Sequence, residues 1–366
     1  PLAMRLVAST LLAPLQGLVS PTILLLLAGA CIANVSAVLA SVALYLLGRR
    51  LTRSDQLARV AAFLFALTPS AAFLSAPYTE SPFALLSFSG MLLHAEGYGT
   101  LAALTWSLTT TLRSNGILHA GFFLYELARR VIRHFCSTPS SFSSFGAWVQ
   151  LIISSGLLLL RALIVFGPFV AIQMYGHFRY CSSPNPMENR SWCTTGTLPM
   201  IYSFVQDHYW NCGPFRYYTL RQLPNFLLAS PFILLTGAGV WVYAKAQPSR
   251  RLITLGLFPD ATHNKGRTDA SGTGDEPHVA YASSKTLLPY VILWFVQVTY
   301  ALITMHVQVI LRFLTSQPAL YLFASSCVLA HLQGPHRHLG GWAILHYFPL
   351  YNVVGIVLFA HFLPPA

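Results

Sequence analysis

Long apolar runs separated by short polar turns organise almost the whole chain. The runs 21–47, 145–175 and 223–244 are each long enough for a membrane helix, which needs about 20 apolar residues. Shorter apolar runs occupy positions 57–74, 81–94, 101–112, 117–128, 287–305, 318–332 and 345–362. The pattern predicts an all-α polytopic membrane protein with about nine or ten membrane segments.

Two basic clusters set the expected topology. They occupy residues 49–53 and 129–133, each directly after an apolar run. Because the cytoplasmic loops of membrane proteins carry an excess of Lys and Arg, we expect both clusters on the cytoplasmic face. The turns at Glu80 and Arg113 then lie on the opposite, non-cytoplasmic face.

Two segments depart from a plain series of crossings. The run 4–18 is short and is interrupted by Pro14, which favours an interfacial or re-entrant segment over a full crossing. The run 145–175 carries Arg161 near its middle. A charge at that depth is costly unless it is paired, faces a cavity or reaches an edge of the membrane by snorkelling.

Two hydrophilic stretches interrupt the apolar pattern. The stretch 176–222 is expected on the non-cytoplasmic face, where Cys181 and Cys193 can form a disulfide if that face is oxidising. It also holds Asn189 in a glycosylation sequon. The stretch 245–286, rich in Gly, Ser, Asp and Thr, is predicted to be a mobile cytoplasmic loop. We therefore expect a single transmembrane domain over 1–366 with these two loops.

Composition supports this class and narrows the function. The chain is 55% hydrophobic and 9% charged, whereas soluble domains carry about 25% charged residues. The net charge of +12 lies in short clusters between apolar runs, which is typical of membrane topology and not of a nucleic-acid partner. The six cysteines show no spacing typical of a metal site, so no metal is expected.

Polar residues from four separate turns are expected together on the non-cytoplasmic face. Arginines can neutralise a phosphate, aromatic rings can stack on a sugar, and a carboxylate can act as a base on a sugar hydroxyl. Each residue alone has a plainer explanation, such as snorkelling, an aromatic belt or a loop cap. The candidates are Tyr78, Glu80, Arg113, Asn115, Asp207, Tyr209, Trp210, Asn225, His306, Gln308 and Arg312.

Several blocks of sequence also resemble one family of enzymes. The run from Pro77-Tyr78-Thr79-Glu80-Ser81-Pro82 to Gly90 is similar to the signature of the GPI mannosyltransferase 2 family. Further similar blocks include Arg113-Ser114-Asn115-Gly116, Gln206-Asp207, Tyr209-Trp210-Asn211, Pro224-Asn225-Phe226, Met305-His306-Val307-Gln308-Val309 and Arg312-Phe313-Leu314. The resemblance runs over nearly the whole chain and is weakest at 136–144, 184–190 and 259–285.

The resemblance implies an endoplasmic-reticulum enzyme with a GT-C-like helix bundle. It implies transfer of mannose from dolichyl phosphate mannose to the first mannose of the GPI-anchor precursor, in an α-1,6 linkage on the lumenal side. The reaction would invert the sugar and need neither metal nor cofactor. The implied partners are the lipid-linked donor, the GPI precursor and the membrane. A small accessory membrane subunit is a further candidate partner.

The resemblance also suggests roles for the candidates. Glu80 and Asp207 would order acceptor hydroxyls or position the base, and Arg113 and Arg312 would bind the donor phosphate. Three further residues would shape the sugar pocket, namely Tyr209, Trp210 and Asn225.

One departure from the family pattern leaves alternatives open. The family carries a Trp-Asp pair in an early lumenal loop, and its aspartate is the expected base, but no Trp is followed by Asp in this chain. The chain also begins at Pro1 without an initiator methionine, so we expect an N-terminally truncated member whose base lies upstream and which can be inactive alone. An inactive relative, a non-catalytic subunit of an anchor-assembly complex and a secondary transporter remain alternatives.

Overall fold

The structure is a computed structural model that describes residues 2–136, 145–181, 190–193, 200–259, 279–334 and 338–361. Within these ranges every named element is a helix, and the one β-bridge joins Gln16 and Val19. The helical fold expected from the apolar pattern is therefore confirmed. The glycosylation candidate, Asn189, lies outside the described residues.

Five stretches of the described chain are long and apolar enough to cross a membrane. They contain the helices α2 (Pro21–Thr52), α8 (Phe145–Tyr180), α10 (Leu223–Ala246), α13 (Leu288–Thr304) and α16 (Leu339–Ala360). A sixth crossing is available if the bent pair formed by 307–314 and α15 (Pro318–Gln333), which meet at 83°, counts as one broken span.

The sequence predicted nine or ten membrane segments, which is more than the five or six found in the described chain. The difference arises because residues 55–136 form shorter helices. These are α3 (Asp55–Ala66), α4 (Ala71–Ser75), α5 (Glu80–Ala95), α6 (Gly99–Leu112) and α7 (Ala120–Cys136). Their lengths of 5 to 17 residues fall below the roughly 20 that a crossing needs. The run expected at 57–74 is broken between α3 and α4.

Local sequence explains where the first long helix starts and stops. The side chain of Ser20 accepts a hydrogen bond from the amide of Ile23, and Pro21 occupies the first turn, where its missing N–H costs nothing. The helix ends at Arg53, whose backbone is left-handed, with φ of 57°. Ser54 then caps α3 by accepting from the amide of Leu57.

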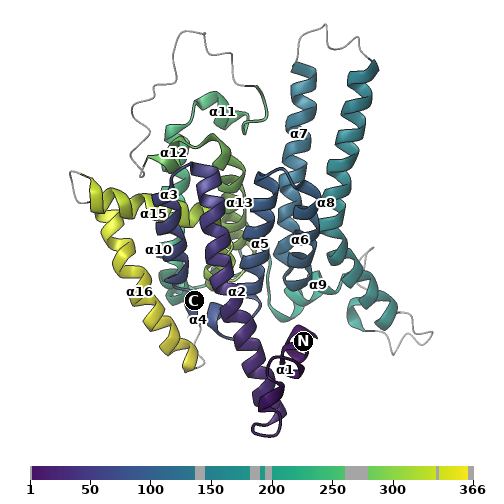
Figure 1. The fold of residues 1–366 in the computed structure, drawn as a ribbon, viewed down its shortest axis with the longest axis vertical. Helices are drawn as coiled ribbons and strands as arrows, with labels where there is room; N and C mark the ends of the chain where they lie inside the picture. Colours follow the sequence, from purple (N-terminus) through teal and green to yellow (C-terminus); the bar gives the residue numbers. More distant parts are fainter. Residues whose placement is uncertain are drawn as a thin grey trace.

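The helices pack as a bundle (Figure 1), and the residues at its two ends differ in character. We call one end the basic face, because α2 and α7 end there with Arg49, Arg50 and Arg133 in their last turns. The opposite end is called the site face, because α5 begins and α6 ends there. Helices α4 and α9 (Ile201–Phe204) lie toward the site face, and α11 (Ser249–Ile253) and α12 (Ala280–Ser283) lie at the basic face.

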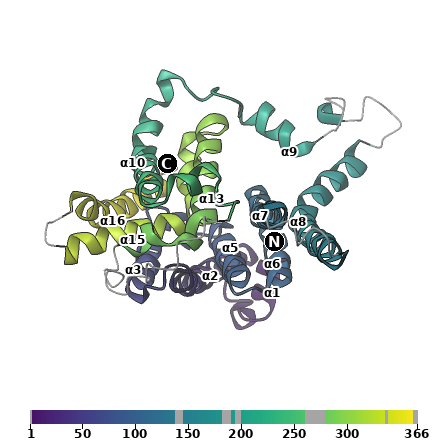
Figure 2. The same cartoon turned by 90° about the horizontal axis from the view of Figure 1, so that it is seen from above.

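The packing order follows the sequence closely in the first half of the chain. Helix α2 packs on α3 and α5, α5 packs on α6, and α6 and α7 both pack on α8. Seen end-on, α7 and α8 lie on one side of the bundle and α15 and α16 on another, while α9 stands at the periphery (Figure 2).

Two expected segments take a more definite form. The run 4–18 contains α1 (Leu2–Ser9), whose eight residues are too few to cross a membrane, and a short 3-10 turn. The loop expected at 245–286 is packed at both ends, since Tyr281 is fully buried and the side-chain Nε2 of Gln247 donates to the carbonyl oxygen of Ala282 at 2.8 Å. The mobility of this loop stays a prediction, and residues 260–278 lie outside the described part.

Replacing Gly90 by alanine tests the packing of α5 against α6. A Cβ at Gly90 would lie 2.5 Å from Cδ1 of the buried Trp106, so overpacking should cost about 1–3 kcal/mol. Gly167→Ala on α8 is the matched control, because a Cβ there meets nothing within 4 Å. Heating the detergent-purified protein and measuring the folded fraction should give a lower midpoint for Gly90→Ala alone. Equal midpoints would contradict the packing.

Candidate functional site

A fully buried carboxylate lies where α5 begins. Glu80 is the first residue of α5, and its exposed fraction is 0%. The positive end of the helix dipole favours a negative charge at this position. A buried carboxylate nevertheless requires positive partners, because removing it from water is costly.

Two arginines supply these partners on the same carboxylate oxygen. Arg113 Nη1 lies 2.6 Å from Glu80 Oε1, and Arg312 Nε donates to that oxygen at 2.5 Å. Arg312 also pairs with it through Nη2. The other oxygen, Oε2, is buried without a hydrogen-bond partner among the described residues. We call Glu80, Arg113 and Arg312 the triad, and its formal net charge is +1.

Aromatic rings surround both guanidinium groups. The guanidinium carbon of Arg113 lies 5.8 Å from the ring centroids of Phe83 and Phe313. That of Arg312 lies 4.8 Å from the ring of Phe73 and 5.4 Å from that of Tyr78. Such cation–π contacts hold the guanidinium planes in place and exclude water from one side of each.

The residues after Arg113 form a tight turn that fixes the position of this side chain at the end of α6. Arg113 caps the C-terminus of α6, and its carbonyl accepts from the amide of Gly116 at 3.0 Å. A Cβ at Gly116 would lie 2.6 Å from the backbone nitrogen of Thr110, so this tight return requires glycine. The motif Arg113-Ser114-Asn115-Gly116 is therefore a turn that packs back onto the helix it follows.

The two arginines keep some access to the surface although the carboxylate does not. The side chain of Arg113 is 14% exposed and that of Arg312 is 31% exposed. Glu80 itself has no exposed surface in this arrangement, and its expected role in ordering acceptor hydroxyls or positioning the base stays a prediction. The accessible part of the triad therefore belongs to the two arginine side chains, which a buried carboxylate holds in place.

Two other candidates, Asn115 and Gln308, are close in sequence to the arginines of the triad. Asn115 follows Arg113 by two positions, and its Oδ1 is buried without a partner among the described residues, as is Oε1 of Gln308. Ser114 donates to the hydroxyl of Tyr202 at 2.9 Å, which ties α9 to the turn. Burial raises the pKa of Tyr202, although the hydrogen bond from Ser114 opposes this shift.

A second cluster forms around His306. Its ring stacks on Tyr217 with centroids 4.5 Å apart, and its Nε2 lies 2.6 Å from the carbonyl oxygen of Trp210. A carbonyl can only accept, so this nitrogen carries the proton. Asn225 donates to the hydroxyl of Tyr217 at 2.8 Å, so His306, Trp210 and Asn225 are brought together around a tyrosine.

Asp207 and Tyr209 are not part of either cluster. Asp207 pairs with Arg216 within the same loop, and its side chain is 64% exposed. Tyr209 is 71% exposed and contacts the rings of Phe204 and His208. Their loop is tied to the end of α13 by the amide of Phe215, which bonds the carbonyl of Ile303 at 2.7 Å.

The sequence analysis included Tyr78 but missed the other aromatic partners of the triad, Phe73, Phe83 and Phe313, and did not include Tyr217 among the candidates. Phe83 lies one helical turn after Glu80, and Phe313 directly follows Arg312. Their positions in the sequence could therefore have predicted that these rings lie close to the charged side chains. The contacts of Tyr217 could not be predicted, because they come from residues 8 and 89 positions away that only the fold brings together. Arg216 was the nearest cation to Asp207 on the C-terminal side and could have been assigned as its partner.

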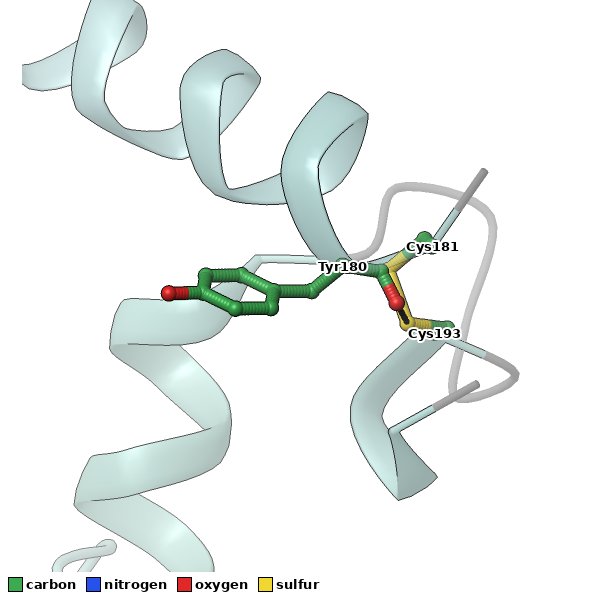
Figure 3. The surroundings of a disulfide bond; sticks show 3 residues. All are labelled: Tyr180, Cys181 and Cys193. Carbon is green, nitrogen blue, oxygen red and sulfur yellow. Dashed lines mark hydrogen bonds between the residues drawn. A yellow bond between two sulfur atoms is a disulfide. The ribbon is translucent and has the colours of Figure 1, made fainter. Parts of the chain in front are cut away.

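The loop after α8 is closed by a disulfide. Cys181 and Cys193 are joined with their Cα atoms 5.4 Å apart, directly after the end of α8 at Tyr180 (Figure 3). Cys193 Sγ also lies 3.6 Å from the carbonyl oxygen of Tyr180. Among the residues that the structure describes, no group of three or more His, Cys, Asp or Glu side chains is placed to hold a metal ion.

These features define a multi-pass α-helical membrane protein with an arginine-rich site at one end. The family model described as mannosyltransferase (PIG-V) matches residues 1–366, and the chain belongs to this family. The resemblance found in the sequence motifs is confirmed.

Three relatives illustrate the match. The chain is 36% identical over 344 residues to the GPI alpha-1,6-mannosyltransferase 2 of Mus musculus, covering 88% of this chain and 66% of the mouse protein. It is 33% identical to that of Homo sapiens with the same coverage, and 31% identical to the GPI mannosyltransferase 2 of Gibberella zeae, covering 92% and 73%. The chain thus spans about two thirds of the length of its mammalian relatives.

One solved structure is similar at a low level. It is the oligosaccharyltransferase of Archaeoglobus fulgidus tethered with an acceptor peptide, with a TM-score of 0.42 and 16% identity over 93% of this chain and 43% of that one. This similarity is too low to support a conclusion about the fold, so the expected GT-C-like bundle remains a prediction.

Replacing Glu80 by glutamine tests the triad. The change keeps the side-chain size but leaves two largely buried guanidinium groups without their counter-charge, which should cost about 3–5 kcal/mol. Asp207→Asn is the matched control, since its ion pair is exposed and should contribute less than about 1 kcal/mol. Thermal unfolding of the purified protein should rank Glu80→Gln well below Asp207→Asn. A Glu80→Gln protein as stable as the control would exclude a buried ionic triad.

Peptide mapping tests the disulfide and the predicted topology together. Protein isolated under alkylating, non-reducing conditions should yield Cys181 linked to Cys193, because this loop is expected on the oxidising side of the membrane. Cys136, which the structure shows exposed in the last turn of α7 at the basic face, should be recovered alkylated and unlinked. Free Cys181 and Cys193 would argue against a lumenal position for the site face.

Proposed function

We propose that this protein transfers mannose from dolichyl phosphate mannose to the first mannose of the GPI-anchor precursor, in an α-1,6 linkage. The proposal rests on the match of all 366 residues to the mannosyltransferase (PIG-V) family. The names of the mouse and human relatives specify the linkage. The proposed location is the endoplasmic-reticulum membrane, with the site face in the lumen.

The triad supports a phosphate-bearing donor. Arginine donates to phosphate oxygens through a planar fork, and two guanidinium edges with a net charge of +1 suit a lipid monophosphate. Glu80 is then a positioning residue, because it is buried and acts by orienting Arg113 and Arg312. The resemblance suggested a different role for Glu80, in which it orders acceptor hydroxyls or positions the base.

The chemistry assigns a leaving-group role to the arginines. In an inverting transfer, the bond from the mannose C1 to the phosphate oxygen breaks as a bond forms to the acceptor oxygen. The electron pair leaves with dolichyl phosphate, and a general base takes the acceptor proton. Charge that develops on the departing phosphate would be stabilised by Arg113 and Arg312, whose geometry is set before the reaction begins.

The cluster around His306 is proposed to hold sugar. Trp210 is largely exposed, Asn225 and His306 are fixed through Tyr217, and aromatic faces of this kind pack against sugar rings. Asp207 and Tyr209 would contribute from the exposed loop, with Asp207 able to accept from an acceptor hydroxyl. The expected base of the family, an aspartate after tryptophan, has no counterpart in this chain.

Complementation tests the proposed function and the role of Arg113. The full-length gene should restore surface GPI-anchored proteins in cells that lack their own enzyme for the second mannose, as measured by flow cytometry. Arg113→Ala should lower transfer by about 100-fold, as expected when one preorganised donor is lost from a developing anion. The precursor with a single mannose should then accumulate.

Two further variants make this test discriminating. Arg113→Lys keeps the charge beside Glu80 but removes the fork, so it should fold and still be impaired. Arg221→Ala removes an exposed cation from the short turn directly before α10 and should leave surface display normal. Normal display with Arg113→Ala would exclude the assigned role, and failure of the unaltered gene would exclude the proposed function.

A further inference from the structure

A cavity of about 500 Å³ lies at the basic face, at the opposite end of the bundle from the triad. Five cationic side chains line it: Arg50, Arg53, Arg129, Arg161 and Lys285. They come from the end of α2, from α7, from α8 and from the start of the segment before α13. Nothing in the proposed mannose transfer uses this cavity.

Most of this positive charge is not neutralised within the described part of the protein. Glu126 is the carboxylate that lines the cavity, and it pairs with Arg130, which does not line it. Arg50 pairs with Glu96 at 3.2 Å. The other four cations form no ion pair with a described residue. Five cations around one cavity with so little compensation would repel one another unless an anion were present.

The position of Arg161 adds to this field. It lies near the middle of the long helix α8, yet its guanidinium group reaches the start of α6, where Nε and Nη2 donate to Thr100 Oγ1 at 3.2 and 3.1 Å. A Cβ at Gly99 would lie 2.6 Å from Arg161 Nη1, so glycine lets the arginine approach. An arginine at the positive end of a helix dipole is unfavourable alone and favours an anion nearby.

An apolar slot of about 180 Å³ adjoins the basic cavity. The two share Phe122, Tyr125 and Pro289, and the slot continues between α7 and α13 along Gly121 and Val296. No charged residue lines the slot. A charged cavity that leads into an apolar slot between two helices matches the polar and apolar halves of an amphipathic molecule. A free phosphate has no apolar part that could occupy the slot.

We propose that this cavity and slot form a binding site for an anionic phospholipid. The cations and the start of α6 bind the phosphate of the headgroup, and the first part of one acyl chain lies in the slot between α7 and α13. The residues at the basic face are those that positive-inside topology places toward the cytoplasmic leaflet, which carries anionic lipids. The site is separate from the triad and does not depend on the proposed transferase activity.

Lipid binding can be measured directly on the purified full-length protein. Native mass spectrometry would follow phosphatidylinositol bound to protein taken from phosphatidylcholine nanodiscs that contain a minor fraction of it. The double variant Arg53→Gln with Arg161→Gln should bind it more weakly, by about fivefold for each arginine removed. Arg59→Gln is the matched control, because it removes a cation from the same face that pairs with Asp55 and does not line the cavity.

The apolar half of the site has its own test. A Cβ at Gly121 meets nothing within 4 Å, so Gly121→Leu can fill the slot without disturbing the fold, and Gly237→Leu on α10 is the control in equally open space. Gly121→Leu should lower retention of phosphatidylinositol, while Gly237→Leu should not. Equal binding by all variants would overturn the proposal. Full displacement of the lipid by inorganic phosphate would also overturn it, by showing a general anion site and not a lipid site.

Discussion

The burial of one carboxylate between two arginines determines how the site face is assembled. Glu80 has no exposed surface, and an ionised group in that environment is tolerable only when opposite charges are held against it. Its partners arrive from the end of α6 and from α14 (Ile310–Leu314), 33 and 232 positions along the chain. The beginning of α5 and these two elements must therefore meet at one point, which ties the first third of the chain to the last.

The same interaction explains why the two arginines are suited to an anion. A flexible arginine loses side-chain entropy each time it binds a phosphate, whereas Arg113 and Arg312 are already held by Glu80 and by aromatic rings. The carboxylate neutralises one of the two positive charges, which makes burial of the pair possible, and leaves a net charge of +1 for a ligand. Preorganised positive charge of this kind is what a departing phosphate requires.

The two ends of the bundle use arginine in opposite ways. At the site face the guanidinium groups are fixed by a buried carboxylate and packed against rings. At the basic face Arg53, Arg129, Arg161 and Lys285 surround a cavity without an acidic partner among the described residues. The triad suits the proposed donor phosphate, which reacts and leaves, because its charges are paired before the donor binds. The basic cavity suits the proposed phospholipid, which remains bound, because the lipid phosphate supplies the missing negative charge.

Much of the helical pattern could be predicted because it depends on local sequence. Apolar runs bounded by proline, glycine and arginine placed α2, α10 and α15 within a few residues of their observed ends. The shared face of Glu80, Arg113 and Arg312 followed from the basic clusters. Their meeting on one oxygen could not be predicted, since it depends on packing between distant segments. The sequence left open whether Arg161 is paired, faces a cavity or reaches a membrane edge, because its contact with Thr100 and its place in the cavity lining depend on how α8 packs against α6.

The role of the triad can be examined in a structure of the full-length protein bound to a short-chain dolichyl phosphate mannose. We expect the donor phosphate within hydrogen-bond distance, about 2.7–3.2 Å, of guanidinium nitrogens of Arg113 or Arg312, with Glu80 still held between them. A phosphate bound away from the triad, or a Glu80 side chain turned out to contact the sugar, would contradict this role of the triad.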